Sequence, residues 1–442
     1  MTLICDMGSS YWNREVETLA RPALRSLQLE RLKKIVGHAL KTRHYSKRLS
    51  GAGIRSPEDL KGIEDLERIP FTTKDDLRES FPRGLLAVDD EEVVRLHTSS
   101  GTTGTPTVIY HTQDDLDRWT DLIARCIVGT GATRRDVFQN MMTYGLFTGG
   151  LGLHYGAERV GMTVIPMGGG NTRRQVQFMK DFRTTVVHAT PSYMLHIHSQ
   201  LGECHAAVAD LALKKGYLGA EPYSENTRLK IEELYGIDVY NSYGLSEMNG
   251  PGVAFECIHK TGMHVWEDAY IMEIIHPETG ELLGEGQEGE VVFTNLIRRA
   301  TPLLRYRTRD RAMVIPGACP CGRTHRRLSR ITGRTDDMLI INGVNVFPSQ
   351  IEEVIMHVPE VGTNYQIHVD KDGALDRLTV KVELDARSFH DDIRELDHLR
   401  KRIRDDIKGS IVITPAVELH EPGSLPVFEG KARRVVDLRK KE

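Results

Sequence analysis

Hydrophobic and polar residues along the chain follow periods that change from one region to the next. Apolar residues recur at helical spacing from Leu29 to Leu40, which predicts that the first ninety residues form helices joined by loops. Farther along, the apolar runs at residues 184–189 and 236–240 are typical of strands, and residues 226–234 between them are typical of a helix. This alternation favours an α/β domain with a largely parallel sheet.

The pattern becomes hairpin-like from about Ala269. Residues 269–275 and 289–294 are typical of two strands, and the residues from Pro277 to Gly280 predict the turn between them. The large domain is therefore expected to contain more than one sheet.

A second change of pattern falls near Gly333 and predicts a domain boundary. The elements expected beyond it are helices at residues 348–358 and 393–407 and strands at residues 365–369 and 378–384. We therefore predict two domains, an α/β domain with several sheets over residues 1–335 and a small α+β domain over residues 336–442.

The last predicted helix is rich in basic residues but does not indicate nucleic-acid binding. Leu396, Leu399, Ile403 and Ile407 form one apolar stripe along it, so its charges are expected on a solvated outer face. The whole chain has 58 basic and 62 acidic residues, a net charge of −4. A protein whose main partner is a nucleic acid or an anionic membrane is expected to have more basic than acidic residues, so this charge argues against both partners.

Two further features of the composition bear on location. No apolar stretch approaches the roughly 20 residues that a membrane span needs, and the N-terminus shows neither the basic nor the apolar region of a secretory signal. Six cysteines in 442 residues are too few for a disulfide framework. We therefore expect a protein of the reducing cytoplasm.

The strongest local signal is the segment from His97 to Thr107, HTSSGTTGTPT. Its hydroxyl groups and glycines suit a loop that presents donors to phosphate oxygens, although an ordinary Ser/Gly turn is an alternative. It is not a Walker A loop, because Thr105-Pro106-Thr107 stands where that motif has Gly-Lys-[Ser/Thr]. The loop carries no lysine, so the charge of a bound phosphate must be balanced from elsewhere.

Further motifs follow this loop in a fixed order and favour the phosphate-binding interpretation. They are Tyr240–Met248 (YNSYGLSEM), Arg305–Asp310 (RYRTRD), Gly333–Asn345 (GRTDDMLIINGVN) and Gly430–Arg434 (GKARR). With the loop, they resemble the core motifs of the adenylate-forming superfamily of acyl-CoA synthetases, peptide-synthetase adenylation domains and luciferases. The segments that resemble the phenylacetate–CoA ligase family in particular are Tyr144–Gly150, Gly219–Pro222 and Gly343–Ser349. The resemblance extends from about Leu27 to Val436.

The resemblance implies a two-step reaction. A carboxylate reacts with ATP to give an acyl-adenylate and pyrophosphate, and the CoA thiol then displaces AMP to give a thioester. Negative charge crowds the oxygens around the α-phosphorus in the first step, so catalysis would depend on positioning and electrostatic stabilisation. The implied partners are ATP, Mg²⁺, CoA and a small aryl acid, and the implied assembly is a homodimer.

The resemblance also implies roles for individual residues. Glu247 matches the acid associated with Mg²⁺, which is commonly held by one or two carboxylates and phosphate oxygens. Asp310 matches the aspartate that accepts from the ribose hydroxyls, and an ion pair with Arg305, Arg307 or Arg309 is its alternative role. The other residues that match nucleotide contacts are Ser99, Ser100, Gly101, Thr102, Thr103, Gly104, Gly219, Ala220, Glu221, Asn241, Ser242, Tyr243, Gly244 and Arg334.

Two residues of the C-terminal region match moving parts of the family. Lys431 matches the catalytic lysine, whose ammonium would supply the charge that the phosphate loop lacks, although it also sits in a basic cluster with Arg433 and Arg434. Asp336 matches the hinge about which the small domain rotates between the two half-reactions.

The stretch matched to aryl-acid binding contains glycines beside aromatic residues, which leave room for a flat ring. Its members are Tyr144, Phe147, Thr148, Gly149 and Gly150. A glycine-rich helix start is the alternative interpretation.

A separate set of residues predicts a metal site. Cys257, His264, Cys319 and Cys321 can supply the four ligands of tetrahedral zinc. Either of two other histidines, His259 and His325, is an alternative nitrogen ligand, and idle cytosolic thiols are the alternative to a site. Four protein ligands leave no open position for chemistry, so the predicted zinc is structural.

The leading hypothesis is therefore an AMP-forming aryl-acid–CoA ligase. Phenylacetate is the first candidate acid, while substituted phenylacetates, benzoates, aminobenzoates and indoleacetate fit the same slot. A second hypothesis is an enzyme that loads the adenylate onto a carrier-protein thiol. A third is a nucleotide-binding regulatory protein without catalysis, against which the presence of Lys431 and Glu247 counts.

Overall fold

The computed structural model describes residues 10–98, 105–146, 148–342, 344–372, 375–386, 388, 393–426 and 434–440. The chain forms two compact units, each built from two stretches of sequence. The first unit comprises Met1–Gly168 and Tyr240–Ile331, and the second comprises Gly169–Val239 and Thr332–Glu442. These units follow spatial contacts and not chain order, so the domain boundary predicted at residue 336 stays a prediction.

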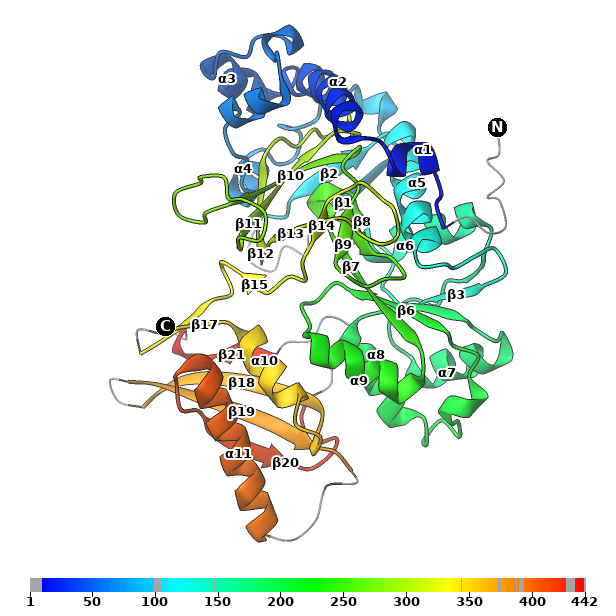
Figure 1. Ribbon diagram of the computed structural model, residues 1–442, viewed down its shortest axis with the longest axis vertical. Coiled ribbons are helices and arrows are strands. Elements are labelled where there is room, and N and C mark those ends of the chain that lie inside the picture. The colour runs from blue at the N-terminus through cyan, green and yellow to red at the C-terminus, as the bar shows by residue number, and fades with distance from the viewer. Residues whose placement is uncertain are drawn as a thin grey trace. The chain divides into compact units, whose positions relative to one another are not determined.

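The first unit begins with helices and continues with short strands (Figure 1). Its helices are α1 (Arg14–Glu17), α2 (Arg21–Ala39), α3 (Arg43–Gly51), α4 (Lys74–Glu79), α5 (Gln113–Gly129) and α6 (Thr148–Val160). Its strands are β1 (Arg95–Thr98), β2 (Val108–His111), β3 (Val137–Asn140), β4 (Thr163–Ile165), β7 (Asp238–Leu245, which starts in the second unit), β8 (Gly250–Glu256), β9 (Met263–Val265), β10 (Tyr270–Ile275), β11 (Gly289–Asn295), β12 (Tyr306–Ala312), β13 (Val314–Ile315) and β14 (Arg327–Leu328).

Several sheets form in this unit, as predicted. Strands β10, β11 and β12 pair antiparallel, and the register Tyr270↔Asn295 to Ile275↔Glu290 confirms the predicted hairpin. Strands β7, β8, β9, β14 and β13 also pair antiparallel in that order. Strands β3 and β4 pair parallel, in keeping with the largely parallel sheet expected of the α/β region.

A buried ion pair holds the N-terminal segment against a loop far along the chain. Glu17 accepts from Arg323 Nε at 2.7 Å, and both side chains are buried. Thr324 N donates to the carbonyl of Glu17 at 3.2 Å. His325 Nε2 lies 3.1 Å from the carbonyl oxygen of Val16. Residues 10–19 are therefore anchored to the loop that also carries Cys319 and Cys321.

The second unit contains two groups of elements. The elements of its first stretch are α7 (Thr172–Asp181), β5 (Val186–Ala189), α8 (Pro191–Gln200), β6 (Lys215–Gly219) and α9 (Glu225–Tyr235). The elements of its second stretch are β15 (Gly333–Arg334), β16 (Leu339–Ile341), β17 (Val344–Val346), α10 (Pro348–Met356), β18 (Val361–Asp372), β19 (Leu375–Leu384), α11 (Ile393–Ile411), β20 (Ala416–His420) and β21 (Val435–Asp437). Strands β5 and β6 pair parallel, as the alternating pattern predicts.

The C-terminal stretch forms an α+β layer pair, as predicted. Its sheet has the strand order β20-β19-β18-β21, with α10 and α11 packed on it (Figure 1). Ile403 and Ile407 of α11 join the core, which confirms the apolar stripe, and the helix extends to Ile411. None of the described helices combines the length and apolar composition needed to cross a bilayer.

Candidate active site

The motif at residues 240–248 forms the end of strand β7 and the turn that follows it. Asn241, Ser242 and Tyr243 are buried in β7. The register of the β7–β8 ladder shifts between Tyr243 and Gly244. A Cβ on Gly244 would lie 1.9 Å from the carbonyl oxygen of Gly250, so only glycine fits this close approach. The strand therefore delivers Glu247 to a tight turn directly after the bulge.

Strand β12 brings Asp310 to the same region. Tyr243 Oη donates to Asp310 Oδ2 at 2.6 Å, and both residues are buried. The arginines considered as partners of Asp310 bind other acids. Arg305 pairs with Glu273 at 2.7 Å, and Arg307 pairs with Glu290 at 2.6 Å. The structure thus joins two of the predicted nucleotide contacts through one short hydrogen bond.

Glu247 lies in the turn Ser246–Met248 and is 7% exposed. Thr107, the last residue of the phosphate-loop motif, donates from Oγ1 to Glu247 Oε1 at 3.5 Å. A carboxylate beside a hydroxyl group is a hard oxygen donor set, which fits Mg²⁺ held jointly with phosphate oxygens. Residues of two predicted motifs therefore meet at this carboxylate.

The predicted acid-binding stretch surrounds the start of helix α6. Asn140 Nδ2 donates both to Tyr144 Oη at 2.9 Å and to the carbonyl of Gly150 at 2.6 Å. Tyr144 Oη also lies 3.1 Å from His154 Nδ1. Thr148 Oγ1 lies 3.2 Å from Ser246 Oγ, next to Glu247. The stretch is a glycine-rich helix start, because α6 begins at Thr148 and includes Gly149, and its acid-binding role stays a prediction.

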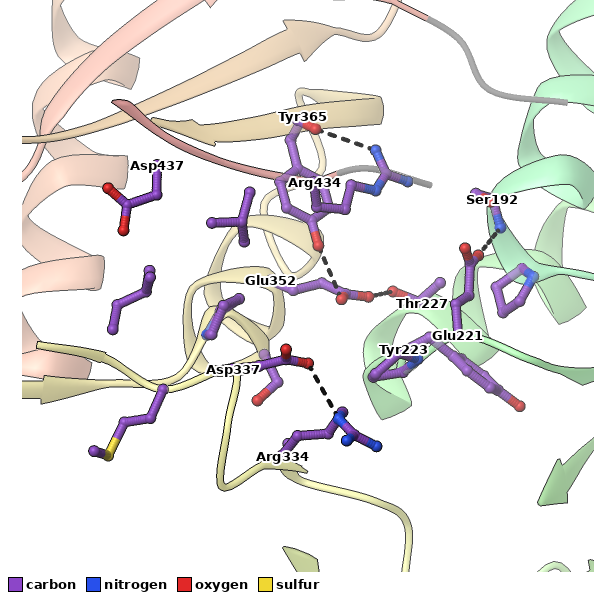
Figure 2. Close-up of a pocket in the computed structure, with 18 of the residues that line it drawn as sticks. Ser192, Glu221, Tyr223, Thr227, Arg334, Asp337, Glu352, Tyr365, Arg434 and Asp437 are labelled. Carbon is purple, nitrogen blue, oxygen red and sulfur yellow. Dashed lines mark hydrogen bonds and ion pairs between the residues drawn. The ribbon is translucent and has the colours of Figure 1, made fainter. Parts of the chain in front are cut away.

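Two more of the predicted nucleotide contacts line a pocket of the second unit (Figure 2). This pocket has a volume of 720 Å³ and contains both Glu221 and Arg334. Gly219 ends strand β6, and Ala220 follows with a φ of 67°. Glu221 Oε1 accepts from the backbone N–H of Ser192 at 2.8 Å, which fixes the Glu221 carboxylate at the N-terminal end of α8.

Arg334 and the predicted hinge residue lie together at this pocket. Arg334 donates to Asp336 from Nε at 2.8 Å and from Nη2 at 2.9 Å. Its Nε also lies 3.8 Å from Asp337, the pair drawn in Figure 2. The carboxylate of Asp336 is exposed.

One buried acid in the same pocket was not among the predicted site residues. Glu352 of α10 accepts from Thr227 Oγ1 at 2.7 Å and from Tyr365 Oη at 2.9 Å (Figure 2). It also accepts from Ser224 N at 3.2 Å. Burial raises the pKa of this carboxyl group. The only available signal was helical spacing, which places position 352 on the same face as Met356.

The four predicted metal ligands also come together. Their ligand atoms all lie within 4.8 Å of one another, with Cys257 Sγ 3.7 Å from Cys319 Sγ and Cys321 Sγ 3.3 Å from His264 Nε2. Tetrahedral zinc with metal–sulfur bonds of about 2.3 Å separates two sulfurs by about 3.8 Å, so the arrangement fits. His264 Nδ1 lies 3.3 Å from the carbonyl of His325, which leaves Nε2 for the metal.

Some predicted residues lie outside the described part of the chain. They are the phosphate-loop residues Ser99, Ser100, Gly101, Thr102, Thr103 and Gly104, together with Phe147 and Lys431. Their roles stay predictions.

Comparisons with known proteins agree with the motifs. Residues 33–296 match the family model described as AMP-binding enzyme, and residues 343–439 match the model described as AMP-binding enzyme C-terminal domain. A phenylacetate–coenzyme A ligase of Thermus thermophilus is 47% identical over 441 residues, covering 96% of this chain and 99% of that protein. The enzyme of the same name from Escherichia coli K12 is 44% identical over 430 residues, covering 96% and 97%.

Solved structures point the same way. A 2-hydroxyisobutyryl-CoA ligase in the postadenylation state, in complex with R3-HIB-AMP, matches with a TM-score of 0.92 at 28% identity and covers 98% of this chain and 94% of that chain. A benzoate CoA ligase from Burkholderia xenovorans LB400 shares the fold, with a TM-score of 0.59 at 18% identity over 80% and 70% of the two chains. These likenesses confirm the predicted α/β class with a separate C-terminal α+β domain. The extent of the family match and the identity over nearly the full length show that the chain belongs to the phenylacetate–CoA ligase family of AMP-binding enzymes and is an AMP-forming acid–thiol ligase.

Proposed function

We propose that the chain is a phenylacetate–CoA ligase. It would join phenylacetate to ATP, giving phenylacetyl-adenylate and pyrophosphate, and then transfer the phenylacetyl group to the sulfur of CoA with release of AMP. The observation that carries this proposal is an identity of 44–47% over nearly the whole chain to four proteins of that name. The acid-binding stretch supports it, because the backbone of Gly150 and the phenol of Tyr144 are held side by side by Asn140.

The geometry of the first unit supports specific roles in adenylation. Asp310, fixed by Tyr243 through one carboxylate oxygen, would accept from a ribose hydroxyl with the other. Glu247 would hold Mg²⁺, which when bound neutralises charge on the phosphate oxygens. Thr107 orients this carboxylate through its hydroxyl group. In the second unit, Glu221 and Arg334 would provide further nucleotide contacts.

We assign the two moving parts to the residues that match the family. Lys431 would stabilise charge on the α-phosphate, and Asp336 would be the hinge of the C-terminal domain. The ion pair of Asp336 with Arg334 supports the hinge role, because an exposed pair contributes little and so breaks easily.

An acid panel tests the proposed substrate. Purified enzyme would be given phenylacetate, hydroxyphenylacetates, benzoate, aminobenzoates and indoleacetate with ATP, Mg²⁺ and CoA, and AMP release would be measured. We expect the highest kcat/KM for phenylacetate. A higher value for a benzoate would contradict the assignment, and turnover with a carrier protein but not with CoA would contradict the acceptor.

We also propose that Cys257, His264, Cys319 and Cys321 bind one structural zinc ion. Their mutual distances support it, as does the second hydrogen bond of the His264 ring. The homodimer and the cytoplasmic location stay predictions that rest on the resemblance and the composition. Light scattering of the purified protein and fractionation of cells would test them.

Metal analysis tests the zinc proposal. Protein prepared without chelators should contain about one zinc per chain. Cys319→Ser should lower the melting temperature while the folded protein still adenylates, because metal bound only by the folded state adds to its stability. Cys204→Ser, at a free cysteine outside the cluster, is the matched control and should change neither quantity. Zinc-free wild-type protein would refute the site.

A further inference from the structure

Arg298 lies behind the carboxylate to which the Mg²⁺ role is assigned, and its side chain is fully buried. Burial lowers the pKa of Arg298 to about 10, opposed by the charges of Asp115 and Glu247 among others, so the group is cationic at neutral pH. Three of its N–H groups end on neutral oxygens. Nη2 donates to the carbonyl of Glu247 at 2.6 Å, Nη1 to Asn249 Oδ1 at 2.8 Å, and Nε to the carbonyl of Thr301 at 2.9 Å.

Three other buried arginines of this unit are held differently, whereas Arg327, which is also buried, donates to neutral oxygens of Thr261, Pro316 and Gly317. Arg125, Arg305 and Arg323 each pair with a buried carboxylate, those of Asp268, Glu273 and Glu17 respectively. A buried cation without a carboxylate partner is costly, and the hydrogen bonds of Arg298 to three buried acceptors offset part of this cost. The planar fork of Arg298 thereby holds these three acceptors in fixed positions.

Two of the three contacts fix the turn that carries Glu247. Asn249, which closes this turn, has a φ of 83°, a left-handed conformation that its hydrogen bond to Arg298 helps to hold. Tyr270 Oη donates to the carbonyl of Met248 at 3.0 Å and accepts from Asn249 Nδ2 at 3.3 Å. Arg298 and Tyr270 thus clamp three consecutive residues of the turn, Glu247 to Asn249.

The third contact connects the turn to the strand that follows the phosphate loop. Thr301, whose carbonyl accepts from Arg298, accepts from Tyr110 N through its hydroxyl at 2.9 Å. Tyr110 belongs to β2, which starts directly after Thr107. Thr107 in turn donates to the carboxylate of Glu247. Arg298 therefore contacts the backbone carbonyl of Glu247 directly, and it is linked to the carboxylate of Glu247 indirectly, through Thr301 and strand β2.

We propose that Arg298 is a positioning residue for adenylation. It orients the Glu247 carboxylate towards the metal that accompanies ATP, and it fixes the position of that carboxylate relative to strand β2, which follows the phosphate loop. This inference rests on the role assigned to Glu247 above. Groups that orient a metal ligand typically change metal affinity or activity about 10- to 100-fold when they are replaced.

The test compares Arg298→Lys, which keeps the charge but loses the fork, with Arg298→Met, which loses both. Two quantities are measured for each variant: the affinity for Mn²⁺ in the presence of the non-reactive analogue α,β-methylene-ATP, by electron paramagnetic resonance, and the Mg²⁺ dependence of acid-driven pyrophosphate exchange. Both variants should bind the metal about 10- to 100-fold more weakly. Both should form thioester normally from supplied phenylacetyl-adenylate and CoA. Tyr270→Phe, which removes one hydrogen bond of the same clamp, should weaken the metal in the same direction by a smaller factor.

Arg125→Lys is the matched control for disturbing a buried arginine, and it should change stability without changing Mn²⁺ affinity. If Arg298→Met does not fold, Arg298→Lys and Tyr270→Phe decide. Folded Arg298→Lys with wild-type metal affinity, or with equal losses in both half-reactions, would overturn the proposal. Glu247→Gln tests the metal role of Glu247 separately from the positioning role of Arg298, since normal metal affinity in that variant would refute the role of Glu247 itself.

Discussion

Replacing Tyr243 by phenylalanine removes one hydroxyl group from the middle of the candidate nucleotide site. That hydroxyl donates to Asp310 Oδ2 at 2.6 Å in a buried setting. The aromatic ring itself is held by Phe293, with ring centroids 6.2 Å apart, so the phenylalanine should keep its place. The variant therefore tests the hydrogen bond with little disturbance of the packing.

The size of the effect follows from the charge on the acceptor. Hydrogen bonds to charged groups contribute about 1.5–3 kcal/mol, and every 1.4 kcal/mol is about a factor of ten. If Tyr243 fixes Asp310 for a ribose hydroxyl, the KM for ATP should rise about 10- to 100-fold. The KM for the aryl acid should change little, because the acid-binding stretch has its own hydrogen bonds through Asn140.

The assay is pyrophosphate exchange with ATP, 2′-deoxy-ATP and 3′-deoxy-ATP for wild type and variant. The comparison is a double-mutant cycle in which one change removes a protein hydroxyl and the other removes a ribose hydroxyl. The penalty for Tyr243→Phe should shrink with the nucleotide that lacks the hydroxyl bound by Asp310. An equal penalty with all three nucleotides would refute the ribose role of Asp310. A melting curve checks that the variant folds.

Three more predictions concern other parts of the structure. Asp268→Asn should lower the free energy of unfolding by about 3–5 kcal/mol in urea titrations, because it leaves buried Arg125, 2.6 Å away, without its carboxylate. Burial would raise the pKa of Asp268, but Arg125 lowers it to about 2. The stability that this pair contributes in the wild type should therefore be complete above about pH 4 and be lost as the pH falls towards 2. The variant should lack this pH dependence. Gly152→Ala places a Cβ 2.5 Å from Trp119 Cζ2, which should cost about 1–3 kcal/mol and, by moving the start of α6, raise the KM for the aryl acid more than that for ATP in steady-state assays. Lys431→Ala should slow adenylation about 100- to 1000-fold but spare thioester formation from supplied adenylate, and equal losses in the two half-reactions would contradict its assignment.

Periodicity predicted helix α11, whose burial is one-sided, because its core-facing residues repeat at regular intervals. The hairpin of β10 and β11 was predicted from two apolar runs and the turn between them, since both strands are buried along their whole length. The antiparallel pairing of β7 with β8 was not predicted, since buried strands of either direction have the same apolar composition. The discontinuous units also lie beyond a linear pattern, because they depend on contacts between distant stretches.

Motif order located most of the candidate site but missed the residues that support it. Arg298 and Arg299 are neighbours of the same type, yet the first is fully buried and the second pairs with Glu92 on the surface. Nothing in the local sequence separates them, because burial at a turn is decided by long-range packing. Glu352 was missed for a similar reason, since two of its hydrogen-bond donors come from Ser224 and Thr227, more than a hundred positions earlier.

The buried ion pair that anchors the N-terminal segment has a consequence for the order of events during synthesis. Glu17 finds its partner Arg323 at a separation of 306 positions, in the loop that also carries two of the proposed zinc ligands. At about 5–20 residues per second, synthesis reaches that loop roughly 15–60 s after Glu17 has been added. During this interval Glu17 lacks its native counter-charge, so residues 10–19 can be anchored only after residue 323 has been synthesised. The family match begins at residue 33, so a chain that starts there would lack Glu17 and leave Arg323 without its acid.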